Sequence, residues 1–354
     1  MTIRVGVIGA GMIGRRAHLP GYREAGAQIV AVADLVGKRA AQAAEDFGAT
    51  SWYEDYRELL SDSTIDAVSV CTPNHLHKEV TIAALRAGKH VLCEKPMAMN
   101  TGEALAMREA AKEIGKLLVV GFQNRFRPDV QRLKQFVDAG DLGAVYYART
   151  GFVRRRGTPF GWFTVKEESG GGPMIDLGVH VIDLTRYLMG NPRAVSVSAA
   201  AYQKFGHYQI PDHQGWCSAD VTDGFRCGDE FDVEDLAAAF IRFENGSTMV
   251  VEVSWAANIK QEGNIYAYLY GESAGARLNP LELYGMHHGV IADTQVPVKD
   301  KNAHFELVRH FVHCVETGEP SLNTPEQGVE IQQIIDAVYE SARIGHSVEL
   351  TPYE

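Results

Sequence analysis

The sequence has 354 residues, more than one hydrophobic core usually holds, so two domains are expected. Hydrophobic residues make up 45% of the chain and charged residues 22%, which is the composition of a globular protein and not of a disordered one. A formal net charge of −11 argues against a nucleic-acid-binding surface, because such a surface needs clustered Lys and Arg.

Cysteine usage and hydropathy indicate the cellular setting. The five cysteines form no Cys-x-x-Cys pair, and two lie in strand-like apolar runs, as is typical of a reduced intracellular protein. Residues 1–5 lead directly into a strand without a signal peptide, and no run of about 18 apolar residues occurs. We therefore expect a cytoplasmic protein that does not enter a membrane.

Short apolar strands alternate with helical segments over residues 1–123. The predicted strands are 3–8, 29–33, 67–71, 90–93 and 117–120. Strands linked by helices in this way run parallel and are joined by right-handed crossovers. The first domain, 1–123, is therefore predicted to be an α/β Rossmann domain with a doubly wound parallel sheet.

The pattern changes after residue 123. A helix is predicted over 130–139, and longer alternating strands follow over 145–153, 194–200, 236–243, 248–255 and 265–270. Such strands, joined by turns such as Glu244-Asn245-Gly246, are typical of an antiparallel sheet with one covered face. Residues 124–354 are thus predicted to form an α+β domain on a large open antiparallel sheet. Its apolar face would be covered in a homodimer or homotetramer.

Three further segments stand out in the second half. The run Gly170-Gly171-Gly172-Pro173 is expected to open a helix that ends at Gly190. Residues 206–234 are irregular and acidic, and are expected to cover a substrate pocket or form a subunit contact. The capping-box pattern of residues 324–327 predicts the start of a last helix, 325–344, which we expect to pack toward the first domain.

A glycine-rich loop, Gly9-Ala10-Gly11-Met12-Ile13-Gly14, follows the first predicted strand and precedes a helix. Gly9 permits a tight turn, Gly11 lets the backbone approach a pyrophosphate, and Gly14 allows close helix packing. The helix N-terminus offers unpaired N–H groups and a positive dipole to the phosphates. We expect Gly9, Gly11, Met12 and Ile13 to bind a dinucleotide.

Asp34 ends the second strand, 20 residues after Gly14. An acidic side chain there accepts hydrogen bonds from ribose hydroxyls and repels a 2′-phosphate, which predicts NAD rather than NADP. Capping of the following turn is the alternative explanation. Lys38 and Arg39 could still support NADP, although they are equally explained as solvated residues at the start of a helix.

Polar residues also follow the later strands of the first domain. In open α/β sheets, ligands bind outside the carboxyl ends of the strands at the switch point. The candidate cofactor contacts there are Cys71, Thr72, Pro73, Asn74, His77, Glu94, Lys95 and Gln123. Capping of the loops is the alternative. His75 and His77 lack a third nearby ligand, so no metal site is predicted.

Together these motifs resemble the glucose–fructose oxidoreductase / inositol dehydrogenase / MocA (Gfo/Idh/MocA) family over nearly the whole chain. The glycine loop, Thr72-Pro73-Asn74, Glu94-Lys95-Pro96 and residues 170–180 followed by Asp183 occur in the family's order and spacing. The resemblance implies an NAD-dependent enzyme that oxidises a secondary alcohol of a sugar, sugar derivative or inositol, or reduces the ketone. It also implies that Lys95, Asp176 and His180 line the reacting centre.

The chemistry of these three residues suits hydride transfer. Asp176 and His180 are four apart on a predicted helix and so share a face. An imidazole that titrates near neutral pH suits removal of the hydroxyl proton, and Asp176 could hold that imidazole or a substrate hydroxyl. Lys95 would stabilise an alkoxide or donate the proton in reduction. A helix-surface ion pair and a zinc site are the alternatives for Asp176 and His180.

Other residues are candidates for substrate contacts. Arg125, Arg154 and Trp162 join Lys95, Asp176 and His180, because guanidinium and aromatic groups bind sugar rings. Positions at a sheet edge or on the surface explain Arg154 and Trp162 equally well. His207, His213, Cys217 and Cys227 could be zinc ligands, but their spacing is irregular.

Two other functions remain open at this point. One is an enzyme with tightly bound NAD that oxidises its substrate transiently, for glycoside cleavage or epimerisation. The other is a non-catalytic regulatory protein, which the presence of Lys95, Asp176 and His180 disfavours. For the favoured dehydrogenase, the expected partner is a small carbohydrate or polyol.

Overall fold

Six parallel strands form the sheet of the N-terminal part of the chain. The computed structural model describes residues 2–159, 161–206, 230–260, 263 and 265–353. The strands are β1 (Arg4–Ile8), β2 (Gln28–Ala33), β3 (Ser51–Tyr53), β4 (Ala67–Val70), β5 (His90–Cys93) and β6 (Leu118–Val120). Their order is β3-β2-β1-β4-β5-β6, and each neighbouring pair is parallel. This is the strand order of the Rossmann fold, so the predicted fold of this part is confirmed.

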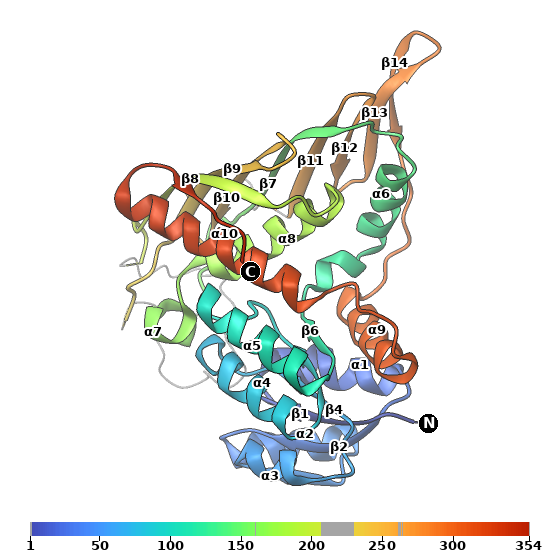
Figure 1. Ribbon diagram of the computed structural model, residues 1–354, viewed down its shortest axis with the longest axis vertical. Coiled ribbons are helices and arrows are strands. Elements are labelled where there is room, and N and C mark those ends of the chain that lie inside the picture. The colour runs from blue at the N-terminus through green and yellow to red at the C-terminus, as the bar shows by residue number, and fades with distance from the viewer. Residues whose placement is uncertain (1, 160, 207–229, 261–262, 264, 354) are drawn as a thin grey trace. The chain divides into compact units, whose positions relative to one another are not determined.

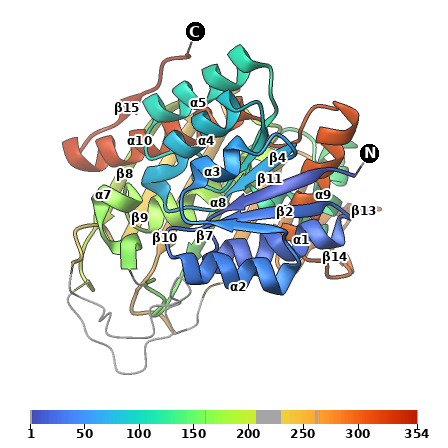
Figure 2. The same cartoon turned by 90° about the horizontal axis from the view of Figure 1, so that it is seen from below.

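Helices cover both faces of this sheet (Figures 1 and 2). On one face lie α1 (Leu19–Glu24) and α2 (Gly37–Phe47), and on the other lie α3 (Tyr56–Ser61), α4 (His77–Arg86) and α5 (Thr101–Ile114). The central strands β1 and β4 are correspondingly apolar except for Arg4 and Ser69, and their side chains are buried apart from Arg4 at the start of β1. A sheet covered on both faces needs such continuous apolar strands.

The second sheet has nine strands and is mostly antiparallel. The strands are β7 (Val145–Val153), β8 (Ala194–Tyr202), β9 (Leu236–Phe243), β10 (Thr248–Ser254), β11 (Tyr266–Gly271), β12 (Ala274–Leu278), β13 (Glu282–His287), β14 (Val290–Gln295) and β15 (Val348–Glu349). Their order is β14-β13-β12-β11-β7-β10-β9-β8-β15. One pair departs from the prediction, since β7 and β10 are parallel. Because helices and two strands separate β7 from β10 in the chain, no hairpin dictates their direction.

Helices α6 (Pro128–Asp138) and α8 (Val179–Leu188) lie on one face of this sheet (Figure 1). The strand residues that alternate with the buried ones point to the opposite face and keep part of their surface accessible. That face, here called the tyrosine–arginine face, carries Tyr147, Arg149, Phe240, Arg242, Glu252, Tyr266, Tyr268, Tyr270 and Arg277.

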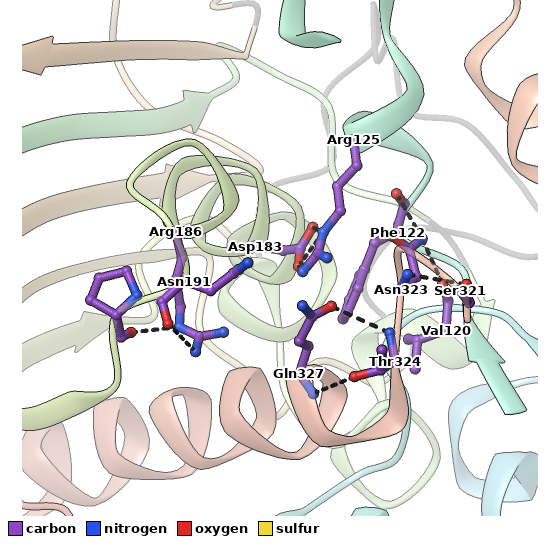
Figure 3. Close-up of polar contacts among 11 residues, drawn as sticks. Val120, Phe122, Arg125, Asp183, Arg186, Asn191, Ser321, Asn323, Thr324 and Gln327 are labelled. Carbon is purple, nitrogen blue, oxygen red and sulfur yellow. Dashed lines mark hydrogen bonds and ion pairs between the residues drawn. The ribbon is translucent and has the colours of Figure 1, made fainter. Parts of the chain in front are cut away.

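The last helix, α10 (Pro325–Ile344), begins as the sequence predicts. The Thr324 N–H donates to Gln327 Oε1 at 3.3 Å, and the Gln327 N–H donates to Thr324 Oγ1 at 3.4 Å, which is the reciprocal capping box (Figure 3). The amide of Asn323 donates to the carbonyl oxygens of Val120 and Phe122 at 3.0 and 3.2 Å. The start of α10 is thus bound to the end of β6.

The described chain divides into two compact units. One holds the described residues of 1–123 and 302–332, and the other holds those of 124–301 and 333–354. The first unit therefore includes α9 (Ala303–Thr317) and the start of α10, whereas the sequence interpretation assigned everything after residue 123 to one domain. None of the described helices is long and apolar enough to cross a lipid bilayer.

Candidate active site

The glycine loop after β1 adopts the geometry of a dinucleotide-binding turn. Gly9 has φ +99°, and a Cβ there would lie 2.5 Å from the carbonyl oxygen of Cys71. A Cβ on Gly14 would lie 2.2 Å from the carbonyl oxygen of Gly9, so the following helix packs directly on the loop. A Cβ on Gly11 would meet no described atom within 4 Å. The loop therefore packs tightly against the protein backbone at Gly9 and Gly14 and has open space beside Gly11.

The carboxylate of Asp34 binds the glycine loop. Its Oδ2 accepts the N–H of Ala10 at 2.9 Å, and its Oδ1 accepts the N–H of Val36 at 2.9 Å. The guanidinium of Arg39 reaches the same Oδ1, at 3.1 Å from Nε and 3.0 Å from Nη2. Asp34 thus caps the turn after β2, the alternative weighed from the sequence, and also lies against the dinucleotide loop.

The ends of β4 and β5 are joined by His77. Its Nδ1 lies 2.7 Å from the carbonyl oxygen of Pro96 and its Nε2 lies 2.9 Å from that of Thr72. Burial lowers the pKa of His77, although both carbonyl acceptors favour the protonated ring. Because both ring nitrogens face carbonyl oxygens, His77 is not placed to bind a metal ion.

Glu94 and Lys95 follow β5 at the same edge of the sheet. The register pairs Ile8 with Val70 and Val70 with Cys93, so the loops after β1, β4 and β5 start side by side. Lys95 is partly exposed, its N–H donates to Glu94 Oε2 at 3.1 Å, and the peptide to Pro96 is cis. Residues predicted to bind the cofactor therefore lie together at this edge of the sheet.

This edge fits a bound NAD. In the described part of the chain, Thr72 Oγ1 and Gln123 Oε1 are buried and have no hydrogen-bond partner. Buried polar atoms of this kind normally have a partner, so they are suited to a polar ligand. Together with the open side of Gly11 and the carboxylate of Asp34, they are the groups at this edge that a bound dinucleotide would meet.

In the second unit, Asp176 lies in the π-helical turn η5 (Met174–Gly178), which leads directly into α8. Asp176 is 5% exposed, and its Oδ2 accepts the indole N–H of the fully buried Trp255 at 2.9 Å. His180 lies in the first turn of α8 and is partly exposed. The predicted helix ends at Leu188, with Gly190 at φ +87° after it, as the sequence indicated.

Glu234 and Tyr339 bind the glycine run that precedes η5, and we call these two residues the helix clamp. The Glu234 carboxylate accepts the N–H groups of Gly172 and Met174, each at 2.9 Å, and the Tyr339 hydroxyl at 3.0 Å. The same hydroxyl accepts the N–H of Ile175 at 3.2 Å. The first N–H groups of the helix, which have no intrahelical acceptor, are thereby satisfied.

Arg125 does not lie where the sequence prediction needs it. It is fully buried and makes a bidentate ion pair with the buried Asp183, with Nε to Oδ2 at 3.0 Å and Nη2 to Oδ1 at 2.5 Å (Figure 3). Its guanidinium also lies over the ring of Tyr187 at 5.1 Å. A substrate contact by Arg125 is therefore not supported; the ion pair holds α8 instead, because a buried charge needs its partner.

Arg154 and Trp162 have other described partners. Arg154 donates to the carbonyl oxygen of Gly157 at 3.0 Å and lies over the ring of Phe152 at 4.5 Å. Trp162 stacks on Phe163 with ring centroids 3.8 Å apart and is partly exposed. Their substrate role stays a prediction.

The possible zinc ligands His207, His213, Cys217 and Cys227 lie outside the described residues, as does most of the acidic segment 206–234. Among the described residues, no group of three or more His, Cys, Asp and Glu side chains is arranged to hold a metal ion.

Sequence reasoning missed the residues that support the predicted ones. Hydrogen bonds between distant segments bring four such residues against the predicted site residues or their helices. They are Trp255, Glu234, Tyr339 and His18. Only His18 carried a local signal, as a histidine four residues after Gly14 in the helical segment that follows the glycine loop. The others become visible only when the sheet and α10 are assembled.

The fold and the glycine loop define a dinucleotide-binding α/β protein. Residues 3–122 match the sequence model of an oxidoreductase family with an NAD-binding Rossmann fold, and residues 130–277 match the C-terminal domain of the same family. The chain belongs to the Gfo/Idh/MocA oxidoreductase family, as its motifs indicated.

Named relatives cover almost the whole chain. D-glucoside 3-dehydrogenase of Escherichia coli is 36% identical over 98% of this chain and 97% of its own length. The NAD(+)-dependent scyllo-inositol 2-dehydrogenase of Bacillus subtilis is 30% identical over 98% of this chain and 96% of its own. A levoglucosan dehydrogenase in complex with NADH and levoglucosan has a similar structure, with TM-score 0.85 and 26% identity over 99% of both chains.

Proposed function

We propose that this protein is an NAD-dependent dehydrogenase that interconverts a secondary alcohol and a ketone on a sugar, a sugar derivative or a cyclitol. The observation that carries the proposal is the likeness to a glucoside dehydrogenase at 36% identity over 98% of the chain, together with the open glycine loop beside Asp34. Because this relative is named as a D-glucoside 3-dehydrogenase, glucosides are the first substrates to test.

Bound NAD supplies a hydride acceptor in the oxidation and, when reduced, a hydride donor in the reverse direction. We assign its contacts to the glycine loop, Asp34 and the strand-end residues Thr72, Glu94, Lys95 and Gln123. The contact of Ala10 with Asp34 supports this assignment, because it holds the ribose-binding carboxylate against the loop.

The reaction needs one base and one group that stabilises a developing alkoxide. In the oxidation, His180 takes the hydroxyl proton, Asp176 orients the imidazole or an adjacent hydroxyl, and Lys95 stabilises negative charge on the reacting oxygen. In the reduction, the proton returns to that oxygen. The hydrogen bond from Trp255 to Asp176 supports the assignment, since it fixes a buried carboxylate in one orientation.

We also propose a homodimer or homotetramer in the cytoplasm. The tyrosine–arginine face supports an oligomer, because tyrosine and arginine are enriched in protein interfaces. Cys71, Cys93 and Cys314 are buried thiols without a disulfide, which supports a reducing compartment.

The test is a screen of sugars, glycosides and cyclitols with NAD and NADP, followed at 340 nm. With a substrate in hand, His180→Ala should lower kcat about 10²–10⁴-fold and leave the NAD dissociation constant nearly unchanged. Higher pH should restore part of the rate, because hydroxide or buffer can take the proton. The exposed His288 provides the control variant His288→Ala. Near-normal turnover of His180→Ala at pH 7 would place the base elsewhere, with Lys95 the leading replacement.

A further inference from the structure

Four buried side chains form one chain of hydrogen bonds in the Rossmann unit. Tyr22 OH lies 2.6 Å from Ser69 Oγ, Ser69 Oγ lies 2.8 Å from His18 Nδ1, and His18 Nε2 lies 2.8 Å from Glu94 Oε1. Their exposed fractions are 0% for Tyr22 and Ser69, 1% for His18 and 5% for Glu94. The other oxygen of Glu94 accepts the N–H of Lys95 at 3.1 Å.

The direction of these bonds follows from the charge of Glu94. Burial opposes ionisation, but the hydrogen bond and the charge of His18, followed by the charges of His304 and Lys95, outweigh it and lower the pKa of Glu94 to about 2. An ionised carboxylate only accepts, so His18 Nε2 must carry the proton in this bond. With a neutral ring, His18 Nδ1 accepts from Ser69 and Ser69 accepts from Tyr22, so that every proton in the chain has an acceptor.

The four residues come from elements that the sequence keeps apart. His18 ends the π-helical turn η1 (Gly14–His18) that follows the glycine loop, and Tyr22 lies one turn later in α1. Ser69 is in β4 and Glu94 follows β5. Gly121 backs the carboxylate, because a Cβ there would lie 3.1 Å from Glu94 Oε1. The helix after the dinucleotide loop is thereby tied to the backbone of Lys95.

The arrangement superficially resembles a serine–histidine–carboxylate triad. Ser69 is fully buried, so no substrate carbonyl can reach its hydroxyl, and hydrolysis by this group is not supported. Packing alone would not require the ionised carboxylate to face both an imidazole and the amide of Lys95. An orienting role accounts for both contacts of Glu94.

We propose that His18 is a positioning residue for Lys95: its Nε2–H holds the Glu94 carboxylate, and that carboxylate fixes the backbone at Lys95. The inference rests on the role of Lys95 in the proposed function. His18 does not touch the reacting atoms and acts through Glu94.

Two substitutions test the two ring nitrogens of His18 separately. In His18→Gln the amide nitrogen can take the place of Nε2 and still donate to Glu94. In His18→Asn the shorter side chain can accept from Ser69 but does not reach Glu94. We expect His18→Asn to lower kcat by up to about 10²-fold, as small misplacements of a catalytic group do, while His18→Gln restores most of the rate.

The pH profile gives a measurement that simple loss of stability would not change. In the parent protein the acid limb of the kcat profile follows protonation of the base His180. Without the His18 donor, burial is left to raise the pKa of Glu94, so a second protonation should move and steepen the acid limb in His18→Asn and not in His18→Gln. Ser69→Ala serves as the destabilising control: it should lower the melting temperature without moving the acid limb. In the cofactor-free protein, ¹⁵N NMR should show His18 protonated at Nε2.

The outcomes distinguish this inference from the proposed function. If the Lys95→Ala variant has a normal kcat, the catalytic role that the proposed function gives to Lys95 is wrong. If Lys95→Ala is impaired while His18→Asn keeps its rate and acid limb, the positioning role of His18 is wrong. Equal losses in His18→Asn and His18→Gln, in step with their melting temperatures, would also overturn it, as would a His18 ring protonated at Nδ1 alone.

Discussion

Asp34 accepts hydrogen bonds from Ala10, Val36 and Arg39 at once, so its carboxylate links the glycine loop to the first turn of α2. The same carboxylate would repel a 2′-phosphate, while Arg39, 27% exposed at its side chain, carries the charge that such a phosphate would attract. We therefore expect the cofactor preference to depend on both Asp34 and Arg39.

We expect Asp34→Ser to narrow the preference for NAD over NADP, because it removes the repulsive charge and the carboxylate partner of Arg39. Adding Arg39→Ala should lower kcat/KM for NADP again. The measurement is kcat/KM with each cofactor for the parent protein and both variants. Equal efficiencies with NAD and NADP in the parent protein would contradict this explanation.

Among single residues, those of the glycine loop and the strand ends could be placed from the sequence, because their backbone requirements are local. It could not locate Trp255 beside Asp176, which lies 79 residues away in the chain. It assigned Arg125 to the substrate as a guanidinium group after a strand, at the edge where ligands bind, whereas in the structure Arg125 is buried and paired with Asp183.

Among the elements, the turn η5 and helix α8 depend most on side chains from elsewhere. The helix clamp supplies acceptors for the N–H groups of Met174 and Ile175 in η5 and of Gly172 just before it. The glycine run leaves room for the clamp, since a Cβ on Gly171 would lie 2.1 Å from the Tyr339 hydroxyl. A side chain at Gly171 would push the clamp away from the helix that carries Asp176 and His180.

Tyr339→Phe should lower kcat several-fold and leave NAD affinity unchanged, because the substitution removes one acceptor from η5 and does not touch the glycine loop. Gly171→Ala should be worse, with a loss of stability of about 1–3 kcal/mol from overpacking. Steady-state kinetics, NAD titration and urea unfolding check both variants. Tyr202, which is 46% exposed, gives the control Tyr202→Phe. Unchanged kcat in Gly171→Ala would show that the clamp does not position the helix.

The sequence predicted long, regular elements better than short ones. The strand 145–153 coincides with β7, whereas β3 has three residues and β12 and β13 contain glycine, which weakens the strand pattern. The parallel pairing of β7 with β10 could not be predicted, since alternation fixes the face of a strand and not its direction.

For the whole molecule, the tyrosine–arginine face is where we expect a second copy to bind. Arg149 lies opposite Tyr268 in the register of β7 and β11, near the middle of the sheet. Tyr268→Glu should convert the oligomer to smaller species in light scattering at micromolar concentration. Trp52→Glu, a similar change at an exposed position of β3, should not. A monomeric parent protein would refute the expectation.

Acid should weaken the Rossmann unit. Burial lowers the pKa of His77, His90, His304 and His310 below the ordinary 6.5, so unfolding takes up protons once the pH falls below about that value. Their contribution to stability is present above pH 6.5 and is lost below it. Glu94, with a pKa of about 2 against 4.5 when unfolded, adds a second loss below about pH 4.5.

Urea unfolding at pH 8, 6.5 and 5 measures this dependence: stability should fall between pH 6.5 and pH 5. His310→Gln should flatten the dependence, since its Nε2 accepts the Leu322 N–H at 3.0 Å only while that nitrogen is unprotonated. Stability that rises between pH 6.5 and 5 would contradict the assignment of neutral buried rings.

The π-helical turns η1 and η5 have a consequence for insertions and deletions. Each holds one residue more per turn than an α-helix can, and each lies directly before a regular helix, α1 or α8. Loss of one residue inside either turn would therefore leave an ordinary α-helix whose two sides keep their relative orientation. The same loss inside a regular helix such as α2 would rotate the two sides by about 100° relative to each other. A single-residue deletion between Asp176 and His180 should thus give a protein that still folds and keeps both side chains on one face of the helix.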